Sequence, residues 1–337
     1  MEQRVLGTTG ITVSSYALGA MTFGSFSIGD HDESVRMIHT ALDAGINFID
    51  TADIYSQGES EVIVGKAIKG RRDDVVLATK FGLPVGDDPN TRGGAARWVK
   101  RAVEDSLRRL DVDHIDLYQM HRPDQHTDID DTLAALTDLV RAGKVRSIGS
   151  SAFPASEIVE AQWVAEKRGH QRFRTEQPQY SLLDRAIEAD VLPTVHRHGM
   201  GVLTWSPLAG GWLSGRVDPA AGSATRAAWG GMFDREDRDN QAKLAAVEQF
   251  AELAAEAGVP LPTLATAFVL NHPAVTSVLL GVSKPQHLAS LIEHSGFRLT
   301  EDVLDRIDEI VHPGTNVRQK DAFILTPVIQ DKRLRRR

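Results

Sequence analysis

Three apolar runs in this chain each end at a polar side chain. INFI (46–49) precedes Asp50, VVLAT (75–79) precedes Lys80 and LYQM (117–120) precedes His121. The separations, 30 residues from Asp50 to Lys80 and 41 from Lys80 to His121, suit repeated strand–helix units. In a parallel barrel the carboxyl ends of successive strands meet at one mouth. We therefore expect these side chains, with the nearby phenol of Tyr55, to converge on one site.

Strand and helix patterns alternate along the chain. We expect a hairpin over 4–14 and strands at 15–21, 46–50, 74–80, 114–120, 144–151, 174–179, 201–206 and 276–281. Helical spacing is found at 31–45, 60–70, 94–110, 128–143, 155–169, 187–199, 241–258, 262–272, 284–296 and 300–311. Asp32 and Ser60 are candidate N-caps, and Pro193 indicates a partly irregular helix. The alternation predicts an α/β fold, a (β/α)8 TIM barrel.

A doubly wound sheet is the competing architecture. It predicts a glycine-rich G-x-G-x-x-G turn after the first strand, and LGAMTFG (18–24) does not match that pattern. Since there is no Gly/Pro-rich linker or internal repeat, we expect a single domain over 1–337. The segment 209–240, after the seventh strand, is the longest stretch without a clear pattern and is expected to be a lid or connector. The tail 312–337 either folds over the barrel mouth or is partly disordered.

Charge and composition restrict the class of protein. Lys plus Arg number 38 and Asp plus Glu 46, and the net charge of −8 disfavours nucleic acid as a partner. The basic run KRLRRR (332–337) is more typical of a solvated tail than of a phosphate site. The chain has no cysteine, which excludes disulfides and thiolate ligands. Without a signal-peptide pattern or a membrane-length apolar run, we expect a cytoplasmic protein with no membrane partner.

Seven segments in chain order resemble the aldo-keto reductase superfamily. They are GINFIDTADIYSQGESE (45–61), VVLATKFG (75–82), HIDLYQMHRPD (114–124), GKVRSIGSS (143–151), EQPQYSLLDR (176–185), WSPLAGGWLSGR (205–216) and LLGVSKPQHL (279–288). The HRPD and WSPLAGG forms look most like the long-loop bacterial branch and the potassium-channel β-subunits. The resemblance implies a barrel enzyme that transfers a hydride from NAD(P)H to a small carbonyl substrate.

The resemblance assigns catalytic roles to four residues. Hydride addition leaves an alkoxide, which a general acid must protonate, and Tyr55 is the expected acid. Lys80 is expected to lower the phenol pKa, ordinarily about 10, and Asp50 to pair with Lys80 and hold it. His121 is expected to donate to the carbonyl oxygen and orient the substrate, or to assist proton transfer.

Each of the four also has a structural interpretation. Tyr55 alone is compatible with a rim aromatic, His121 with a hydrogen-bonded structural histidine and Asp50 with a cap. Lys80 is the hardest to explain in this way, although a lysine can snorkel from a strand end. Taken together with the resemblance, the catalytic interpretation is favoured. A lone histidine without cysteines or a second nearby histidine predicts no metal site.

The resemblance also implies a set of cofactor-binding residues. Trp205 matches the aromatic residue that stacks on nicotinamide, and Ser151 and Gln177 match the carboxamide-binding pair. The turn at 206–210 would face the pyrophosphate with its N–H groups, and the helix after the eighth strand would hold an anion at its N-terminus. The full set is Ala20, Met21, Asp50, Ser151, Gln177, Trp205, Ser206, Pro207, Leu208, Ala209, Gly210, Arg216, Gly281, Ser283, Lys284 and His287.

Some positions depart from the family pattern. Ala152 stands where many relatives have Asn, and His287 where many have Arg or Gln. Ser290 and Leu291 replace an acidic residue and Asn at the adenine end. The resemblance implies NADPH, with Lys284 near the 2′-phosphate, helped by Arg216 or His287, while NADH stays open.

Two functions from different classes remain. A carbonyl reductase would line its pocket with Met21, Tyr55, Phe81, His121 and part of 209–240. A regulatory subunit like the potassium-channel β-subunits would bind NADPH as a sensor. The channel-subunit pattern has Asn in the slot of His121, so the histidine favours the enzyme. A metal-dependent hydrolase on the same fold is disfavoured because metal-ligand clusters are absent. The substrate and the oligomeric state are not specified by any pattern.

Overall fold

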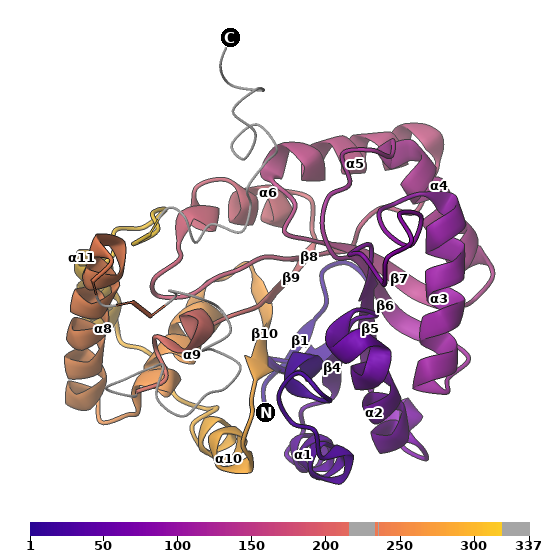
Figure 1. Ribbon diagram of the computed structural model, residues 1–337. Helices are drawn as coiled ribbons and strands as arrows, with labels where there is room; N and C mark the ends of the chain where they lie inside the picture. Colours follow the sequence, from indigo (N-terminus) through magenta and orange to yellow (C-terminus); the bar gives the residue numbers. More distant parts are fainter. Residues whose placement is uncertain (216–232, 235, 319–337) are drawn as a thin grey trace.

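A computed structural model describes residues 1–215, 233–234 and 236–318 as a parallel barrel ringed by helices (Figure 1). The closed barrel has the order β10-β3-β4-β5-β6-β7-β8-β9. Its strands are β3 (Tyr16–Gly19), β4 (Phe48–Asp50), β5 (Val76–Phe81), β6 (Ile115–Met120), β7 (Val145–Ser151), β8 (Thr175–Gln177), β9 (Gly201–Thr204) and β10 (Val275–Gly281). The (β/α)8 barrel predicted from the sequence is confirmed.

Helices follow every barrel strand. They are α1 (His31–Asp43), α2 (Glu59–Ile68), α3 (Ala96–Leu110), α4 (Ile129–Arg141), α5 (Ala155–Arg168), α6 (Val191–Arg197), α8 (Arg238–Glu256), α9 (Leu261–Asn271), α10 (Pro285–Glu293) and α11 (Glu301–Ile310). Within the described chain, no individual helix combines the length and apolarity of a membrane span. One pair, 240–256 with 261–271, passes that test jointly on length and composition but is bent by 93°.

The N-terminal hairpin and the barrel interior share one apolar cluster. Strands β1 (Gln3–Val5) and β2 (Thr12–Ser14) pair antiparallel, which confirms the expected hairpin. Leu6, which follows β1, and Val13 of β2 pack against inward-facing residues of the barrel: Ala17, Phe48, Ala78, Leu117, Leu203 and Leu279. This layer fills the barrel below its mouth, so the interior is a packed core and not a channel.

The alternation of side chains along a strand places polar groups directly above this apolar layer. Successive residues of a strand point to opposite faces, so the next inward position lies two residues further on. That position is Asp50 after Phe48 on β4 and Lys80 after Ala78 on β5. Gln119 on β6 follows Leu117 in the same way. The period of two therefore brings three polar side chains to one level of the barrel.

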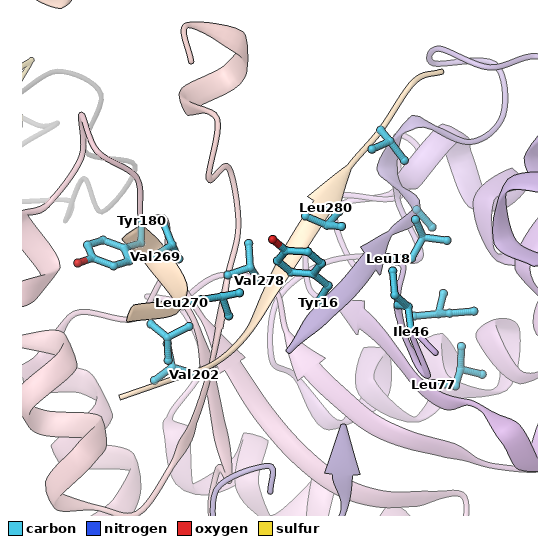
Figure 2. Close-up of a cluster of buried hydrophobic side chains, with 14 of the residues drawn as sticks. Tyr16, Leu18, Ile46, Leu77, Tyr180, Val202, Val269, Leu270, Val278 and Leu280 are labelled. Carbon is cyan, nitrogen blue, oxygen red and sulfur yellow. The ribbon is translucent and has the colours of Figure 1, made fainter. Parts of the chain in front are cut away.

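A second, larger apolar cluster lies between the barrel and the helices. Figure 2 shows part of it, with Tyr16, Leu18, Val278 and Leu280 of the neighbouring strands β3 and β10 beside residues of α9. The Tyr16 hydroxyl reaches Thr266 of α9 at 3.3 Å. These contacts fix the helices around the rim and leave the carboxyl ends of the strands open.

Two predicted N-caps are wrong. Asp30, not Asp32, caps α1, because the Asp30 carboxylate accepts hydrogen bonds from the backbone N–H groups of residues 32 and 33. Ser60 is buried inside α2 and its hydroxyl donates to the carbonyl oxygen of Ala20 at 2.7 Å. It links α2 to the end of β3 instead of capping the helix.

Pro193 does not interrupt a helix. Helix α6 begins at Val191, so the proline lies in the first turn, where a missing N–H costs little. The irregular part of the expected helix is instead a separate 3-10 turn, Ala186–Glu188.

The start of the C-terminal segment packs against the chain that follows β8. The side-chain oxygen of Asn316 accepts from the backbone N–H of Ala186 at 2.8 Å, and the N–H of Val317 donates to the carbonyl of Leu183 at 2.9 Å. Residues 319–337 lie outside the described residues, as does the middle of the predicted 209–240 connector. The expectations for these segments stay predictions.

Replacing Gly65 with Ala tests the close packing of α2, the helix that follows the Tyr55 turn, against α3. A Cβ at this position would stand 2.4 Å from the backbone oxygen of Leu110 in α3. Overpacking of this kind costs about 1–3 kcal/mol, whereas the better helix propensity of Ala offsets only about 1 kcal/mol. We expect Gly65→Ala to lower the free energy of unfolding in urea. Gly296→Ala, which points into open space, is the matched control. Equal stability of both variants and the wild type would contradict this packing argument.

Candidate active site

A buried ion pair lies at the base of the barrel mouth. The ammonium of Lys80 is fully buried and donates to the carboxylate of Asp50, which is 2% exposed. The same nitrogen donates to the backbone carbonyl of Thr51 at 2.9 Å and to the hydroxyl of Tyr55 at 3.1 Å. An ammonium has three N–H donors, so the donors of Lys80 match these three acceptors.

Two amides satisfy the second carboxylate oxygen of Asp50. Gln119 of β6 and Gln177 of β8 each donate from the side-chain nitrogen to Oδ1 at 2.9 Å. The Gln177 amide also lies 3.2 Å from the side-chain oxygen of Gln119. A buried charge is tolerated when it is paired and its remaining lone pairs accept hydrogen bonds. The pair is therefore fixed from several strands at once.

The turn that carries Tyr55 has a strained backbone. It is a 3-10 turn, Tyr55–Gly58, in which Ser56 and Gln57 adopt φ of 47° and 56°. Non-glycine residues in this left-handed region cost of the order of 1 kcal/mol each, and neighbouring contacts must hold them. Here the Ser56 hydroxyl donates to the carbonyl of Phe23 at 3.0 Å, and Glu59 accepts from the N–H of Ser25 at 2.7 Å. The loop after β3 thus holds the phenol in place.

Burial and charge shift the pKa of Tyr55 in opposite directions. Burial raises the pKa of the phenol, and the neighbouring Lys80 lowers it, with a net pKa above the ordinary value. The sequence-based expectation of a lowered pKa is therefore wrong in its net direction, because burial outweighs the cation. Burial also lowers the pKa of Lys80, but Asp50 and Tyr55 outweigh it and the net pKa is raised. Near neutral pH the phenol is protonated and the amine is charged.

His121 lies beside the phenol as a neutral imidazole. Its ring is edge-on to that of Tyr55, with centroids 5.8 Å apart and an interplanar angle of 81°. Burial, Lys80 and Arg122 all lower the pKa of His121, which lies well below the usual value. A neutral imidazole carries one N–H donor, suited to hydrogen-bonding a carbonyl oxygen.

A cavity of about 930 Å³ opens above these groups. Asp50, Tyr55 and His121 line it, while Lys80 lies behind them, fully buried. Most of the residues expected to bind the cofactor also line it: Met21, Asp50, Ser151, Gln177, Trp205, Ser206, Pro207, Leu208, Ala209, Gly210, Gly281 and Ser283. The ends of most barrel strands thus contribute to one cavity.

Several expected site residues lie elsewhere. Ala20 is fully buried, and Phe81 is fully buried and stacked on Tyr118 with centroids 4.8 Å apart, so neither is a wall residue of the cavity. Lys284 and His287 are exposed at the start of α10, outside the cavity wall. Arg216 lies outside the described residues.

The cavity wall suits a nicotinamide dinucleotide. Trp205 presents an indole at the end of β9, and its ring N–H donates to the carbonyl of Gln177 at 3.2 Å. In the turn that follows, Ser206, Ala209 and Gly210 have φ of 60°, 48° and 66°. Turns with such dihedrals can form anion-binding concavities from successive N–H groups. An aromatic face and a turn with left-handed dihedrals therefore lie on one wall.

Other residues in and beneath the cavity wall escaped the sequence analysis. Gln119 was detectable, because a polar residue at an inward position of an apolar strand is a local signal. Arg122 directly follows His121 in the HRPD segment. Asp184 lies in the EQPQYSLLDR segment, where the resemblance assigns it no role, and Lys243 and Arg318 come from distant segments that no sequence pattern marks. Within the described parts of the chain, no group of three or more His, Cys, Asp or Glu residues could hold a metal ion.

Comparison with known proteins identifies the relationship. The Aldo/keto reductase family matches residues 17–312. This chain belongs to that family. It is similar to an uncharacterized oxidoreductase of Bacillus subtilis, YrpG, with 39% identity over 96% of this chain and 99% of the relative.

Two further relatives carry different names. The aldo-keto reductase YhdN of Bacillus subtilis is 35% identical over 92% of this chain and 94% of the relative. A putative voltage-gated potassium channel subunit beta of Schizosaccharomyces pombe is 33% identical over 92% and 93%. The family therefore includes proteins named as oxidoreductases and as channel subunits.

A double-mutant cycle tests the ion pair at the base of the site. Removing one partner of a buried pair typically costs about 3–5 kcal/mol, because the other charge stays buried without compensation. We expect Lys80→Met alone to lower the free energy of unfolding in urea by this amount. The double variant Lys80→Met/Asp50→Asn should lose clearly less than the two single losses added. Additive losses would show that the two residues are not coupled.

Proposed function

We propose that the protein is an NADP(H)-dependent oxidoreductase that reduces small aldehydes and ketones to alcohols. The observation that carries the proposal is a protonated phenol held 3.1 Å from a buried ammonium, beside a neutral imidazole, in the wall of a large cavity. The family membership and the relatives named as oxidoreductases support the same class of reaction.

The side chains divide the acid catalysis between them. When bound, the nicotinamide cofactor supplies the hydride for the carbonyl carbon. Tyr55 donates its phenolic proton to the carbonyl oxygen, so that the product is the neutral alcohol. The charge left on the phenolate is stabilised by the ammonium of Lys80, which already donates to that oxygen. His121 donates an N–H to the carbonyl oxygen and orients it toward the phenol.

The proposed preference for NADPH rests on the start of α10. Lys284 occupies the N-cap position of this helix, and no acidic residue lies in its first turn. A cation and a helix N-terminus favour a phosphate, and a carboxylate there would repel it. We assign the 2′-phosphate to this end of the site, with Lys284 as its first contact.

A regulatory subunit is the second candidate, because one relative is named a putative potassium channel subunit beta. Such a protein would bind the cofactor without needing the acid chemistry. Two observations favour the enzyme. His121 stands where the channel-subunit pattern has Asn, and Asp50, Tyr55 and Lys80 are all present.

Replacing Tyr55 with Phe tests the proton donor. Loss of a positioned general acid lowers the rate about 10²- to 10⁴-fold. We expect Tyr55→Phe to reduce kcat for NADPH oxidation with a panel of aromatic and dicarbonyl aldehydes by that factor, with unchanged affinity for NADPH. Tyr118→Phe is the matched control, because the Tyr118 hydroxyl is buried with no hydrogen-bond partner in the described residues and does not line the cavity.

The variant tests the acid, and the wild type separates the two candidate functions. Turnover that persists in Tyr55→Phe would reject Tyr55 as the acid. Tight NADPH binding by the wild type without turnover of any aldehyde would favour the regulatory subunit.

Replacing Lys284 with Gln tests the cofactor preference. A charge-assisted hydrogen bond to a phosphate at an exposed position is worth about tenfold in affinity. We expect the Kd for NADPH, measured by fluorescence titration, to rise by that factor while the Kd for NADH changes little. Equal affinity of the wild type for both cofactors would reject the NADPH preference. An equal rise of both Kd values would place Lys284 on a part that the cofactors share.

A further inference from the structure

Arg122 presents a cation to the same cavity as the proposed acid. It follows His121 at the end of β6, and it lines the cavity together with Tyr55 and Trp205. Its guanidinium carbon lies 5.6 Å from the centre of the Trp205 ring. The catalytic scheme above does not use this charge.

Most hydrogen-bonding capacity of Arg122 is unused. A guanidinium has five N–H donors. One of them donates to the backbone carbonyl of its neighbour His121 at 2.9 Å, and among the described residues no carboxylate forms a side-chain hydrogen bond with it. Burial lowers the pKa of Arg122, and the charge of the buried Glu176 carboxylate opposes this shift. The hydrogen bonds of Glu176, however, come from the Ser150 hydroxyl and the N–H of Phe153.

Such a cation is poorly compensated. Arg122 is partly buried, and burial lowers its pKa below the usual value. A desolvated cation is stabilised most by a carboxylate or phosphate that accepts two parallel N–H bonds. By contrast, Arg318 in the same cavity wall pairs with Asp237 at 2.9 Å. Arg122 is therefore the wall arginine whose geometry leaves room for an anionic ligand.

The barrel order separates this cation from the proposed 2′-phosphate site. Strand β6 lies four strands away from β10 in either direction around the closed barrel. The turn after β9 and the start of α10 after β10 carry the proposed pyrophosphate and 2′-phosphate contacts. An anion at Arg122 is therefore distinct from the proposed 2′-phosphate site. The proposed pyrophosphate turn is closer, because Trp205 directly before it lies 5.6 Å from the guanidinium, so the NADPH affinity of Arg122→Gln distinguishes a substrate anion from the pyrophosphate.

The neighbouring wall is apolar. Met21, Ile54 and Leu83 follow β3, β4 and β5 and line the cavity, and Phe26 joins them from the loop after β3. A ligand that combines an apolar body with an acid group would match these walls and Arg122 together.

We infer that Arg122 forms a carboxylate-binding subsite, and that the preferred substrates are aldehydes or ketones that carry a carboxylate on an apolar, for example aromatic, body. The carboxylate accepts from the free N–H groups of Arg122 while the carbonyl oxygen meets Tyr55 and His121. This inference rests on the proposed function, because it names the substrate class of the same site.

Steady-state kinetics with matched pairs of substrates test the subsite. The probes are the ortho, meta and para isomers of carboxybenzaldehyde and the methyl ester of each, which differ in charge. We expect the wild type to favour at least one acid over its ester in kcat/KM. Arg122→Gln should lower kcat/KM for that acid by about 10- to 100-fold, the worth of a hydrogen bond between charged groups, and leave the ester nearly unchanged. Arg122→Lys should give an intermediate loss.

Controls separate recognition from positioning. Arg36→Gln removes an exposed arginine of α1 and should change neither substrate. The melting temperature and the Kd for NADPH of Arg122→Gln should equal those of the wild type. Equal losses for acid and ester would overturn the inference and make Arg122 a residue that positions His121 and Trp205. A weakened NADPH affinity with no selective loss for the acid would overturn it in favour of a cofactor contact.

A binding measurement keeps the inference testable if the proposed function fails. If the wild type reduces no aldehyde, isothermal titration of benzoate into the NADP⁺-saturated protein replaces the kinetics. Binding that is lost in Arg122→Gln and retained in Arg36→Gln would support the carboxylate subsite without a reductase activity. Absent binding, or equal binding by both variants, would overturn it.

Discussion

The buried contact between Lys80 and Asp50 is the interaction on which the site depends. It places two charges at the level of the barrel where the apolar layer ends, and the surrounding strands supply the amides and carbonyls that make it tolerable. The ammonium then faces the phenol of Tyr55 and the carboxylate faces two glutamines. Because one pair fixes both orientations, the proposed acid chemistry of Tyr55 and the packing of the barrel mouth are parts of the same arrangement.

Strain is concentrated where the proposed site needs unusual backbone directions. Ser56 and Gln57 turn the chain after Tyr55 in left-handed conformations, and Ser206 and Ala209 do so beneath the proposed pyrophosphate site. Ala152, at the end of β7, has φ of 55° as well. Asn tolerates that region better than Ala, which gives a backbone reason for the Asn expected there from the family resemblance. The chain keeps the conformation although this residue does not favour it.

Much of the fold was predictable because its signals are local. Apolar runs that close on Asp50, Lys80 or His121 are visible in the sequence, and alternation with helices limits the topology. The same period of two places Phe81 on the face opposite Lys80, so its assignment to the pocket was avoidable. Two features were harder to predict from the sequence: the N-cap at Asp30, and the presence of Arg318 in the cavity wall. They depend on where the chain turns and on pairing between segments far apart in sequence.

The three acceptors of Lys80 have a consequence for the energetics of turnover. In the proposed reaction the carboxylate of Asp50 stays anionic, the carbonyl of Thr51 stays neutral, and only the oxygen of Tyr55 changes from neutral to anionic. The ammonium already points at the atom on which charge will appear. Water would have to reorient around a new anion, whereas this site responds without moving its dipoles. The dipoles around Tyr55 are oriented when the protein folds, so the proton transfer itself needs little further reorganisation free energy.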